Sequence, residues 1–164
     1  MSNLSGFVKR VRDVMRNDAG INGDAQRIEQ IAWMLFLKVY DAKEEDWEFD
    51  DEKYESIIPE NLRWRNWAHT ENQNDGLTGD QLLNFVNNDL FSTLKKLEIN
   101  PSTPIRQSIV RTTFEDANNY MKDGVLMRQI INIIDELDFG SYEETHAFGE
   151  IYETILKELQ SAGS

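Results

Sequence analysis

The sequence lacks cysteine and is poor in positive charge, and both features restrict its function. Without cysteine the chain can form no disulfide, no cysteine-ligated zinc site and no thiol nucleophile. Its 17 lysine and arginine residues face 30 aspartate and glutamate residues, which gives a net charge of -13. This charge argues against a protein that coats nucleic acid or an anionic membrane through bulk charge. Any contact with DNA would have to be local.

Long apolar runs are also missing. The longest run, from Ile31 to Leu37, is far shorter than the roughly 20 residues that a membrane span needs. The amino terminus has neither the apolar stretch nor the small-residue cleavage site of a signal peptide. We therefore expect a soluble, cytoplasmic protein that makes no contact with a membrane.

What the sequence does contain is a helical pattern. Apolar residues recur at helical spacing in five places, and no stretch alternates strictly over the length of a half-buried strand. Between Ile31 and Tyr40 only Lys38 is charged, so a helix from Asp24 to Tyr40 should be buried on most sides. We predict an all-α fold, in which residues 1–164 form a single helical domain of about five main helices around this buried central helix.

The ends of the first helices are marked by polar and glycine residues. The first helix is amphipathic and ends near residues 17–20. The central helix begins after residues 22–24, whose short polar side chains can accept hydrogen bonds from free backbone amides. Thr78 and Gln81 form a capping-box pair that opens a further helix. The apolar faces are Leu4, Phe7, Val8, Val11 and Met15 in the first helix, and Leu82, Leu83, Val86, Leu90, Leu94 and Leu97 in the helix after Thr78.

Three more helices are predicted toward the carboxyl end. The pair Thr103–Pro104 is typical of an N-cap followed by proline in the first helical position, and it predicts a short helix over residues 105–110. Asp123 is placed to lead a helix, which the Phe-Gly pair at residues 139–140 would end. The last helix carries its apolar face between residues 148 and 159.

Acidic residues dominate from Asp41 to Glu60, where ten carboxylates are opposed by Lys43 and Lys53 alone. We interpret this segment as a solvated connector, in which nothing would raise the pKa of a carboxyl group for acid-base catalysis. In the segment that follows, residues 61–67, aromatic residues alternate with arginine and asparagine, which predicts a short extended segment.

Motifs for catalysis are not evident. The two histidines, His69 and His146, are not spaced as metal ligands and have no identifiable neighbouring nucleophile, so we assign them surface or helix-end roles. A nucleotide-binding glycine loop follows a strand, and none of the glycines follows a strand pattern. We therefore predict no catalytic, cofactor-binding or metal-binding residue in this chain.

Basic residues remain as candidates for a binding site. Those of the first helix form either a phosphate-facing side or a solvated surface, and Arg27 is a third basic point just inside the central helix. Residues 63–67 combine guanidinium groups that can bind phosphates with rings that can stack on bases. Alternatively, Trp64 and Trp67 anchor a loop on the core while the arginines pair with the acidic connector. The candidate DNA-binding residues are Lys9, Arg10, Arg12, Arg16, Arg27, Arg63, Trp64 and Arg65.

Two segments carry a family resemblance. Residues 23–41 (GDAQRIEQIAWMLFLKVYD) strongly resemble the amino-terminal helical domain of the modification subunits of type I restriction-modification systems, which are N6-adenine DNA methyltransferases. Residues 146–163 (HAFGEIYETILKELQSAG) are similar to the connection that, in this family, precedes a Gly-Glu-Phe-Tyr-Thr-Pro motif and the cofactor-binding domain. The resemblance covers nearly the whole chain and is weakest from Asp41 to Gly76.

The resemblance implies a role in a larger enzyme. In that family two modification subunits and one specificity subunit enclose DNA, and the methyl group passes from S-adenosylmethionine to adenine N6. The chain lacks the family's Phe-x-Gly-x-Gly loop and its Asn-Pro-Pro-Phe/Tyr motif, since Asn100-Pro101 continues with Ser102. The resemblance therefore implies an amino-terminal domain for DNA engagement and subunit assembly, inactive alone and without a cofactor of its own. The implied partners are DNA, the specificity subunit, a second modification subunit and the restriction subunit.

Two other classes of protein stay open on composition. The net charge and the carboxylate run also suit an acidic protein that imitates DNA and inhibits a DNA-binding enzyme. A helical protein-interaction scaffold with no nucleic-acid role is the third possibility. The basic first helix and the two resembling segments favour the methyltransferase domain.

Overall fold

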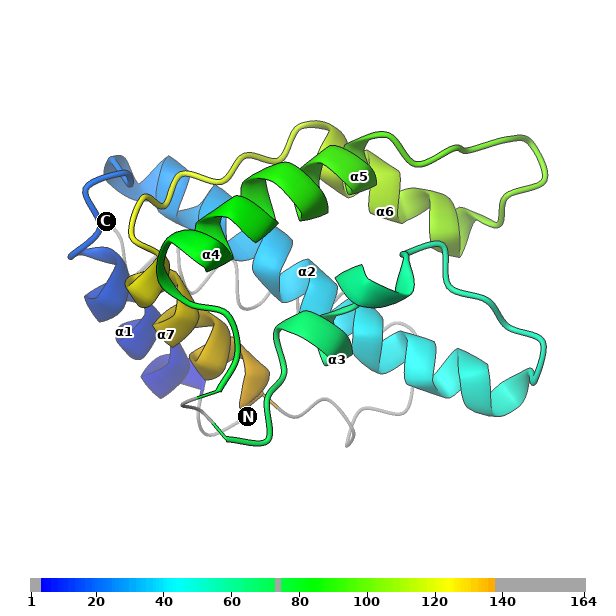
Figure 1. The fold of residues 1–164 in the computed structure, drawn as a ribbon, viewed down its shortest axis with the longest axis horizontal. Coiled ribbons are helices and arrows are strands. Elements are labelled where there is room, and N and C mark those ends of the chain that lie inside the picture. The colour runs from blue at the N-terminus through cyan, green and yellow to red at the C-terminus, as the bar shows by residue number, and fades with distance from the viewer. Residues whose placement is uncertain (1–3, 73–74, 138–164) are drawn as a thin grey trace.

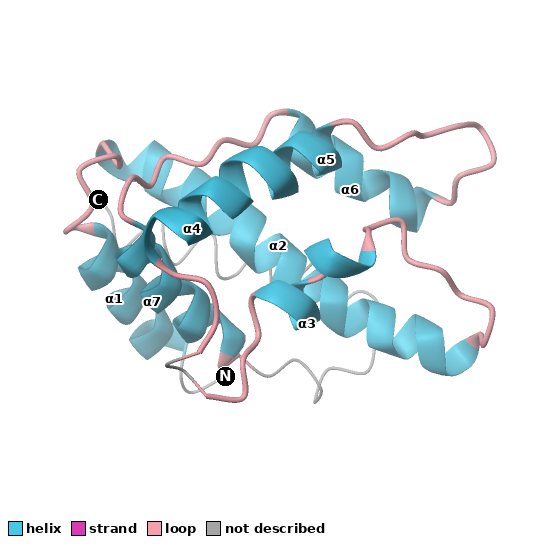
Figure 2. Cartoon of the chain, viewed as in Figure 1, coloured by secondary structure: helices cyan, strands magenta, loops and turns pink. Residues whose placement is uncertain are grey.

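Helices make up the regular secondary structure of the computed structural model, which describes residues 4–72 and 75–137 (Figure 1). The described part contains no strand, so the prediction of an all-α fold is confirmed (Figure 2). None of the described helices is long and apolar enough to cross a membrane. The elements are α1 (Leu4–Met15), α2 (Gly23–Asp50), a 3-10 turn η1 (Glu60–Leu62), α3 (Trp64–Trp67), α4 (Gly79–Asn84), a π-helical segment η2 (Phe85–Leu90), α5 (Phe91–Lys95), α6 (Ile105–Glu115) and α7 (Gly124–Asp135).

The central element is α2, a helix of 28 residues and therefore about 40 Å long. It runs through the middle of the fold, and α1 and α7 lie side by side at one end (Figure 1). Ile31, Leu35 and Val39 are buried along one stripe of α2. The predicted buried central helix is confirmed, because the apolar stretch of α2 is covered by the other helices.

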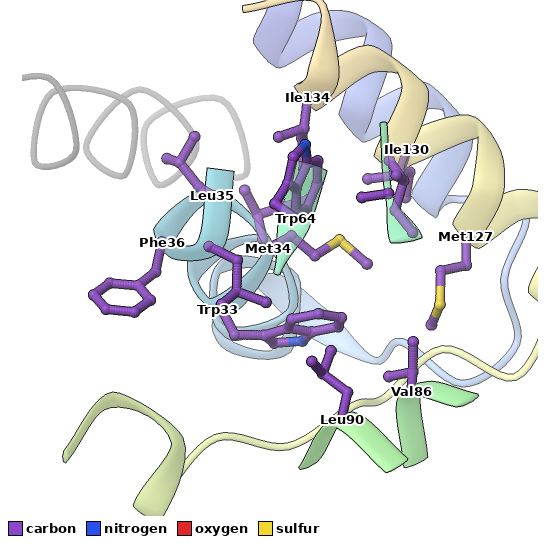
Figure 3. Packing of buried hydrophobic residues seen from close by; sticks show 14 of the residues in the cluster. Trp33, Met34, Leu35, Phe36, Trp64, Val86, Leu90, Met127, Ile130 and Ile134 are labelled. Carbon is purple, nitrogen blue, oxygen red and sulfur yellow. The ribbon is translucent and has the colours of Figure 1, made fainter. Parts of the chain in front are cut away.

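Aromatic rings join α2 to the helices above it. The ring of Trp33 meets that of Phe91 on α5 edge to face at 4.9 Å, and Phe91 meets Phe114 on α6 in the same way at 5.3 Å. Trp33 points toward Leu90, while Trp64 lies beside Ile134 of α7 (Figure 3). Such pairs add directional preference to burial, and here they fix α2 against α5 and α6.

The expectation of a solvated acidic connector from Asp41 to Glu60 is wrong for the first half of this segment. Residues 41–50 continue α2, and Asp41 and Glu44 are buried rather than solvated. Arginine side chains from beyond the connector neutralise these two carboxylates, as described below. Residues 51–59 do form a loop. The charge of the segment is visible in the sequence, whereas the burial of Asp41 and Glu44 on one side of a continued helix is not.

One continuous helical run, from α4 through η2 to α5, carries the predicted leucine-rich face. Leu82, Val86, Leu90 and Leu94 are fully buried and are spaced four residues apart. In an α-helix four residues turn about 400°, so a strict four-residue repeat drifts by about 40° per step. The π-helical segment holds more residues per turn and compensates for this drift. The stripe therefore stays directed at the core over the whole run.

Some predicted helix starts are confirmed and others are wrong in detail. Asp123 caps α7 by accepting hydrogen bonds from the amides of Val125 and Leu126. Thr78 is the N-cap of α4, but its side chain makes no capping hydrogen bond to the described residues, so the capping box does not form.

At α6 and α2 the caps also differ from expectation. Pro104 is itself the N-cap of α6, because Thr103 instead closes a turn in which its hydroxyl accepts from the amide of Asn100. The helix also runs on to Glu115, past the expected end at residue 110. At α2 the cap is Asn22, whose amide donates to Gln26 at 2.8 Å, while its side chain makes no cap within the described part.

Several predictions fall outside the described residues. These are the helix end at residues 139–140, the last helix over residues 148–159 and the family-like segment 146–163. Phe7, Val11 and Met15 of the first apolar face are buried, as expected.

Candidate nucleic-acid and subunit interface

The basic side of α1 is exposed, and its ion pairs lie at the surface. Lys9 Nζ is 3.0 Å from Asp13 Oδ2, and Arg16 Nη1 is 3.8 Å from the other oxygen of Asp13. The hydrogen bond from Lys9 lowers the pKa of Asp13. Arg10 reaches across to the C-terminal end of α7, where its Nη1 is 2.8 Å from Oε2 of Glu136, the residue after the helix. Surface pairs of this kind contribute about 0–1 kcal/mol, so these cations can exchange their partners for phosphate at little cost.

Two further candidates are less open to solvent. Arg12, on the same helix, has a partly buried side chain. Arg27 is mostly buried, and its Nη1 is 2.6 Å from Asp24 Oδ1 one turn earlier on α2. The exposed basic surface of α1 therefore consists of Lys9, Arg10 and Arg16, and we call these three residues the α1 basic surface.

The segment around Trp64 is folded differently from the prediction. Residues 60–62 form η1 and residues 64–67 form α3, so the expected short extended segment is wrong. Trp64 and Trp67 pack ring to ring at 5.5 Å and are both buried. The indole of Trp67 donates to the carbonyl of Leu62. Each indole thus faces inward, and a helical turn is the conformation that lets both do so three residues apart.

Arg63 and Arg65 reach from this turn to α2. The Nε atom of Arg63 is 3.5 Å from Glu44, and its two terminal nitrogens bind Glu48 and Glu60. Arg65 binds Asp41 and Glu48, with both nitrogen-oxygen distances at 2.9 Å. We call Asp41, Glu44, Glu48, Arg63 and Arg65 the α2–α3 charge network. The structure thus matches the alternative in which the arginines pair with the acidic segment and the tryptophans anchor it.

Burial changes the protonation chemistry of this network. Desolvation raises the pKa of Glu44, although hydrogen bonds with Ser56 and Tyr54 and the charge of Arg63 favour its ionised form. The expectation that nothing would raise a carboxyl pKa in this segment is therefore wrong. Tyr54 donates to Glu44 at 2.6 Å, and burial raises the pKa of Tyr54 to about 12. Since Glu44 is held by partners from its own chain, these contacts indicate a structural role.

A second polar junction lies where α7 ends. Asp135 accepts a hydrogen bond from the indole of Trp64 at 2.8 Å, and Lys38 of α2 donates to both its carboxylate and its carbonyl. His69 Nδ1 lies 2.7 Å from the other carboxylate oxygen. Burial alone would raise the pKa of Asp135, but the hydrogen bonds from Trp64 and His69 and the charge of Lys38 outweigh it and lower that pKa. The hydrogen bond to Asp135 raises the pKa of His69.

Arg128 contacts the loop before α4 from within the core. It is buried on α7, and its Nη2 donates to the carbonyl of Ala68 at 2.8 Å. Gly76, with a φ of +95°, passes so close that a Cβ atom there would lie 2.4 Å from Arg128 Nη1. The backbone angle favours glycine at this position, and any larger residue would also have to displace the Arg128 guanidinium. Neither Asp135 nor Arg128 was identified from the sequence, although a charge inside an apolar helical repeat is the signal that marks both.

Metal and cofactor sites can be tested on the described residues. No group of three or more histidine, aspartate or glutamate side chains among them is placed to hold a metal ion. Without a strand, the described part also offers no strand-glycine loop for S-adenosylmethionine, so its residues do not fit that cofactor. The arrangement thus presents one exposed basic surface and two internal polar junctions.

Comparison with known proteins identifies the family of the chain. A family model described as the HsdM N-terminal domain matches residues 4–134. The chain belongs to this family. The type I restriction enzyme EcoEI methylase subunit of Escherichia coli is 49% identical to this HsdM N-terminal domain over 161 residues, which are 98% of the chain and 32% of that protein. The resemblance to type I modification subunits is thereby confirmed.

Two solved structures share the fold of this HsdM N-terminal domain. A modification subunit from Vibrio vulnificus YJ016, described as part of a type I restriction enzyme, is 33% identical with a TM-score of 0.86, covering 99% of this chain and 36% of that one. A second, described under complex assembly and conformational transition of the type I R-M system, is 31% identical with a TM-score of 0.72, covering 94% of this chain and 30% of its own. The chain thus spans about a third of the length of these proteins.

Proposed function

We propose that the chain is the assembly and DNA-engagement domain of a cytoplasmic type I adenine methyltransferase subunit. In the full-length subunit, S-adenosylmethionine and the target adenine would bind outside residues 1–164, and the specificity, second modification and restriction subunits would be the partners. The family and the relative named as a methylase subunit support the enzyme class. The observation that supports a DNA contact is the exposure of the α1 basic surface on a chain whose net charge is -13.

The physical argument is one of locality. A few cations that face phosphates contribute to affinity through release of counterions from DNA, whatever the charge of the remote surface. The α1 basic surface suits this role because its partners, Asp13 and Glu136, are themselves exposed and bind it weakly. The arginines of the α2–α3 charge network are less suited, because they would have to leave buried carboxylates without a partner.

The test replaces Lys9, Arg10 and Arg16 together by alanine in the full-length subunit and titrates the assembled complex with DNA. We expect weaker binding to all DNA sequences alike. The affinity should also depend less steeply on salt concentration, by the amount that the loss of up to about three phosphate contacts produces. S-adenosylmethionine binding should not change. As a matched control, Lys53, Lys96 and Arg111 are also exposed, and their joint replacement by alanine removes the same charge from other surfaces. Equal effects of the two triple variants would refute a local contact by α1.

A further inference from the structure

The last two turns of α2 extend beyond the core, at the end of the fold opposite α1 (Figure 1). On them Phe49 is 90% exposed, more than any other large apolar side chain among the described residues. Trp47, two residues earlier, points about 200° away, where it packs on Tyr40 and Tyr54. Phe49 therefore lies on a side of α2 that the described residues leave uncovered.

The neighbours of Phe49 on that side are acidic. At helical spacing Glu45 and Asp46 lie one turn before it, both exposed, and Asp50 follows it at the end of the helix. We call Glu45, Asp46, Phe49 and Asp50 the α2 end surface. Glu44 and Glu48, in contrast, turn toward Arg63.

The helix itself adds to this negative potential. The carboxyl end of a helix carries a partial negative charge from its last carbonyl groups, so cations are favoured there and carboxylates are not. The last turn of α2 nevertheless contains acidic residues and no basic residue. Within the described part, Asp46 forms an ion pair with Lys43 at 3.6 Å, and the side chain of Asp46 is largely exposed to solvent. A cationic partner would relieve repulsion among these carboxylates that the described residues relieve only at Asp46.

We infer that the α2 end surface docks a cationic protein surface of another subunit of the assembly, with the Phe49 ring inserted between arginine or lysine side chains. An aromatic ring in such a position is a typical anchor of a protein interface and also attracts a guanidinium over its face. DNA and anionic lipid do not fit, because the surface carries their own sign of charge. A second copy binding through the same face does not fit either, since an isologous contact would place these carboxylates against each other.

The inference that the partner is a subunit of the same enzyme rests on the proposed function. The inference that the partner is cationic rests on the α2 end surface alone. The experiment uses the full-length modification subunit and measures its affinity for the purified specificity subunit and, separately, for the purified restriction subunit, without DNA. Phe49→Ala should weaken one of these affinities about tenfold or more, as loss of an aromatic anchor does. Glu45→Lys should weaken the same affinity and make it less sensitive to salt.

Matched controls separate this effect from general surface changes. Ile105→Ala removes another exposed apolar side chain, which is 85% exposed on α6, and Glu98→Lys reverses another exposed carboxylate. Both controls should bind within about twofold of the unmodified subunit.

Three results would overturn the inference. In the first, Phe49→Ala and Glu45→Lys leave both affinities and their salt dependence unchanged. In the second, Phe49→Ala dissociates modification subunits from each other and leaves both affinities unchanged, which would make a second copy the occupant. In the third, the controls weaken binding as much as the two variants do. Because DNA is absent here, failure of the DNA contact by the α1 basic surface would be seen only in the separate titration of the Lys9, Arg10 and Arg16 variant.

Discussion

Two sets of arginines, on α1 and on α3, look alike in sequence and differ in what surrounds them. Arg10 of α1 forms an ion pair with Glu136, and the side chains of both residues are about half exposed. On the N-terminal side of α3, Arg63 is 7% exposed and lies against Glu44, which is 1% exposed. Both sets were named from the sequence as candidates for DNA binding. The comparison teaches that a basic residue is available to a ligand when its own partners are solvated, and not when they are buried.

The difference has an energetic basis. An exposed pair is screened by water and salt, so removing one member costs little. A buried pair has already lost its hydration, so removing one member leaves a charge with neither water nor partner. The α2–α3 charge network should therefore be needed for folding, while the α1 basic surface should be dispensable for folding.

The sharpest way to break this comparison is to replace Arg63 by methionine. We expect a loss of about 3–5 kcal/mol in the free energy of unfolding, measured by denaturant titration of this chain near neutral pH, because Glu44 keeps its buried charge. The loss should shrink at lower pH. Burial already raises the pKa of Glu44, so the native state binds its proton at a higher pH than the unfolded state does.

The matched variant is Arg63→Met combined with Glu44→Gln, which removes both charges and keeps an oxygen that can accept from Tyr54. It should recover most of the stability, since no buried charge is left unpaired. A double variant as unstable as Arg63→Met, or a loss below about 1 kcal/mol in the single variant, would contradict the structural role of the network.

The sequence predicted this part of the fold incompletely, and the reason is physical. Periodicity of apolar residues located α2, α7 and the helix after Thr78, because burial of apolar surface dominates their packing. It did not extend α2 past Tyr40, because the buried residues of the helix beyond that point, Asp41 and Glu44, are carboxylates. The spacing of carboxylates at positions 41, 44 and 48 is itself helical, and it becomes informative only together with the arginines about twenty residues later.

The binding site was predicted as a list of basic residues with Trp64, and the acidic connector was named as a partner of the arginines only in the alternative interpretation. Charge alone cannot separate Arg10 from Arg63, because exposure depends on which elements meet in three dimensions. Exposure of Phe49 was not predicted either. Phe49 is close to Trp47 in the sequence, but it lies on the other side of the helix, where it is exposed. Family resemblance, by contrast, was readable from residues 23–41, which lie inside the range 4–134 that the family model matches.

An intermediate case is the pair of His69 and Asp135, which joins a half-exposed side chain to a mostly buried one. The pKa of His69 is raised in the folded state, so its stabilisation is fully present below the unfolded value near 6.5 and is lost as pH rises through the higher folded value. Between pH 6 and pH 8.5 we expect a decrease of less than about 1 kcal/mol, because solvent screens the pair. His69→Gln should remove this slope in thermal or denaturant unfolding.

The control for that measurement is His146→Gln, which removes the other histidine and should keep the slope. The low pKa of Asp135 acts in a different range, since its stabilisation is present above about 3.8 and is lost as pH falls through its folded value. A slope that survives in His69→Gln would assign the pH dependence to another group.

The smallest effect is expected on α1. Arg10→Ala removes a pair whose nitrogen-oxygen distance is 2.8 Å, as close as many buried pairs, yet the exposure of both side chains should limit the loss to about 0.5 kcal/mol. A double-mutant cycle of Arg10→Ala and Glu136→Ala, measured by denaturant unfolding, should give a coupling of about 0.2–1 kcal/mol. In 1 M salt, where the screening length falls to about 3 Å, the coupling should decrease. A salt-independent coupling above about 2 kcal/mol would show that this pair fastens α1 to α7, and Arg10 would then be as unavailable to phosphate as Arg63.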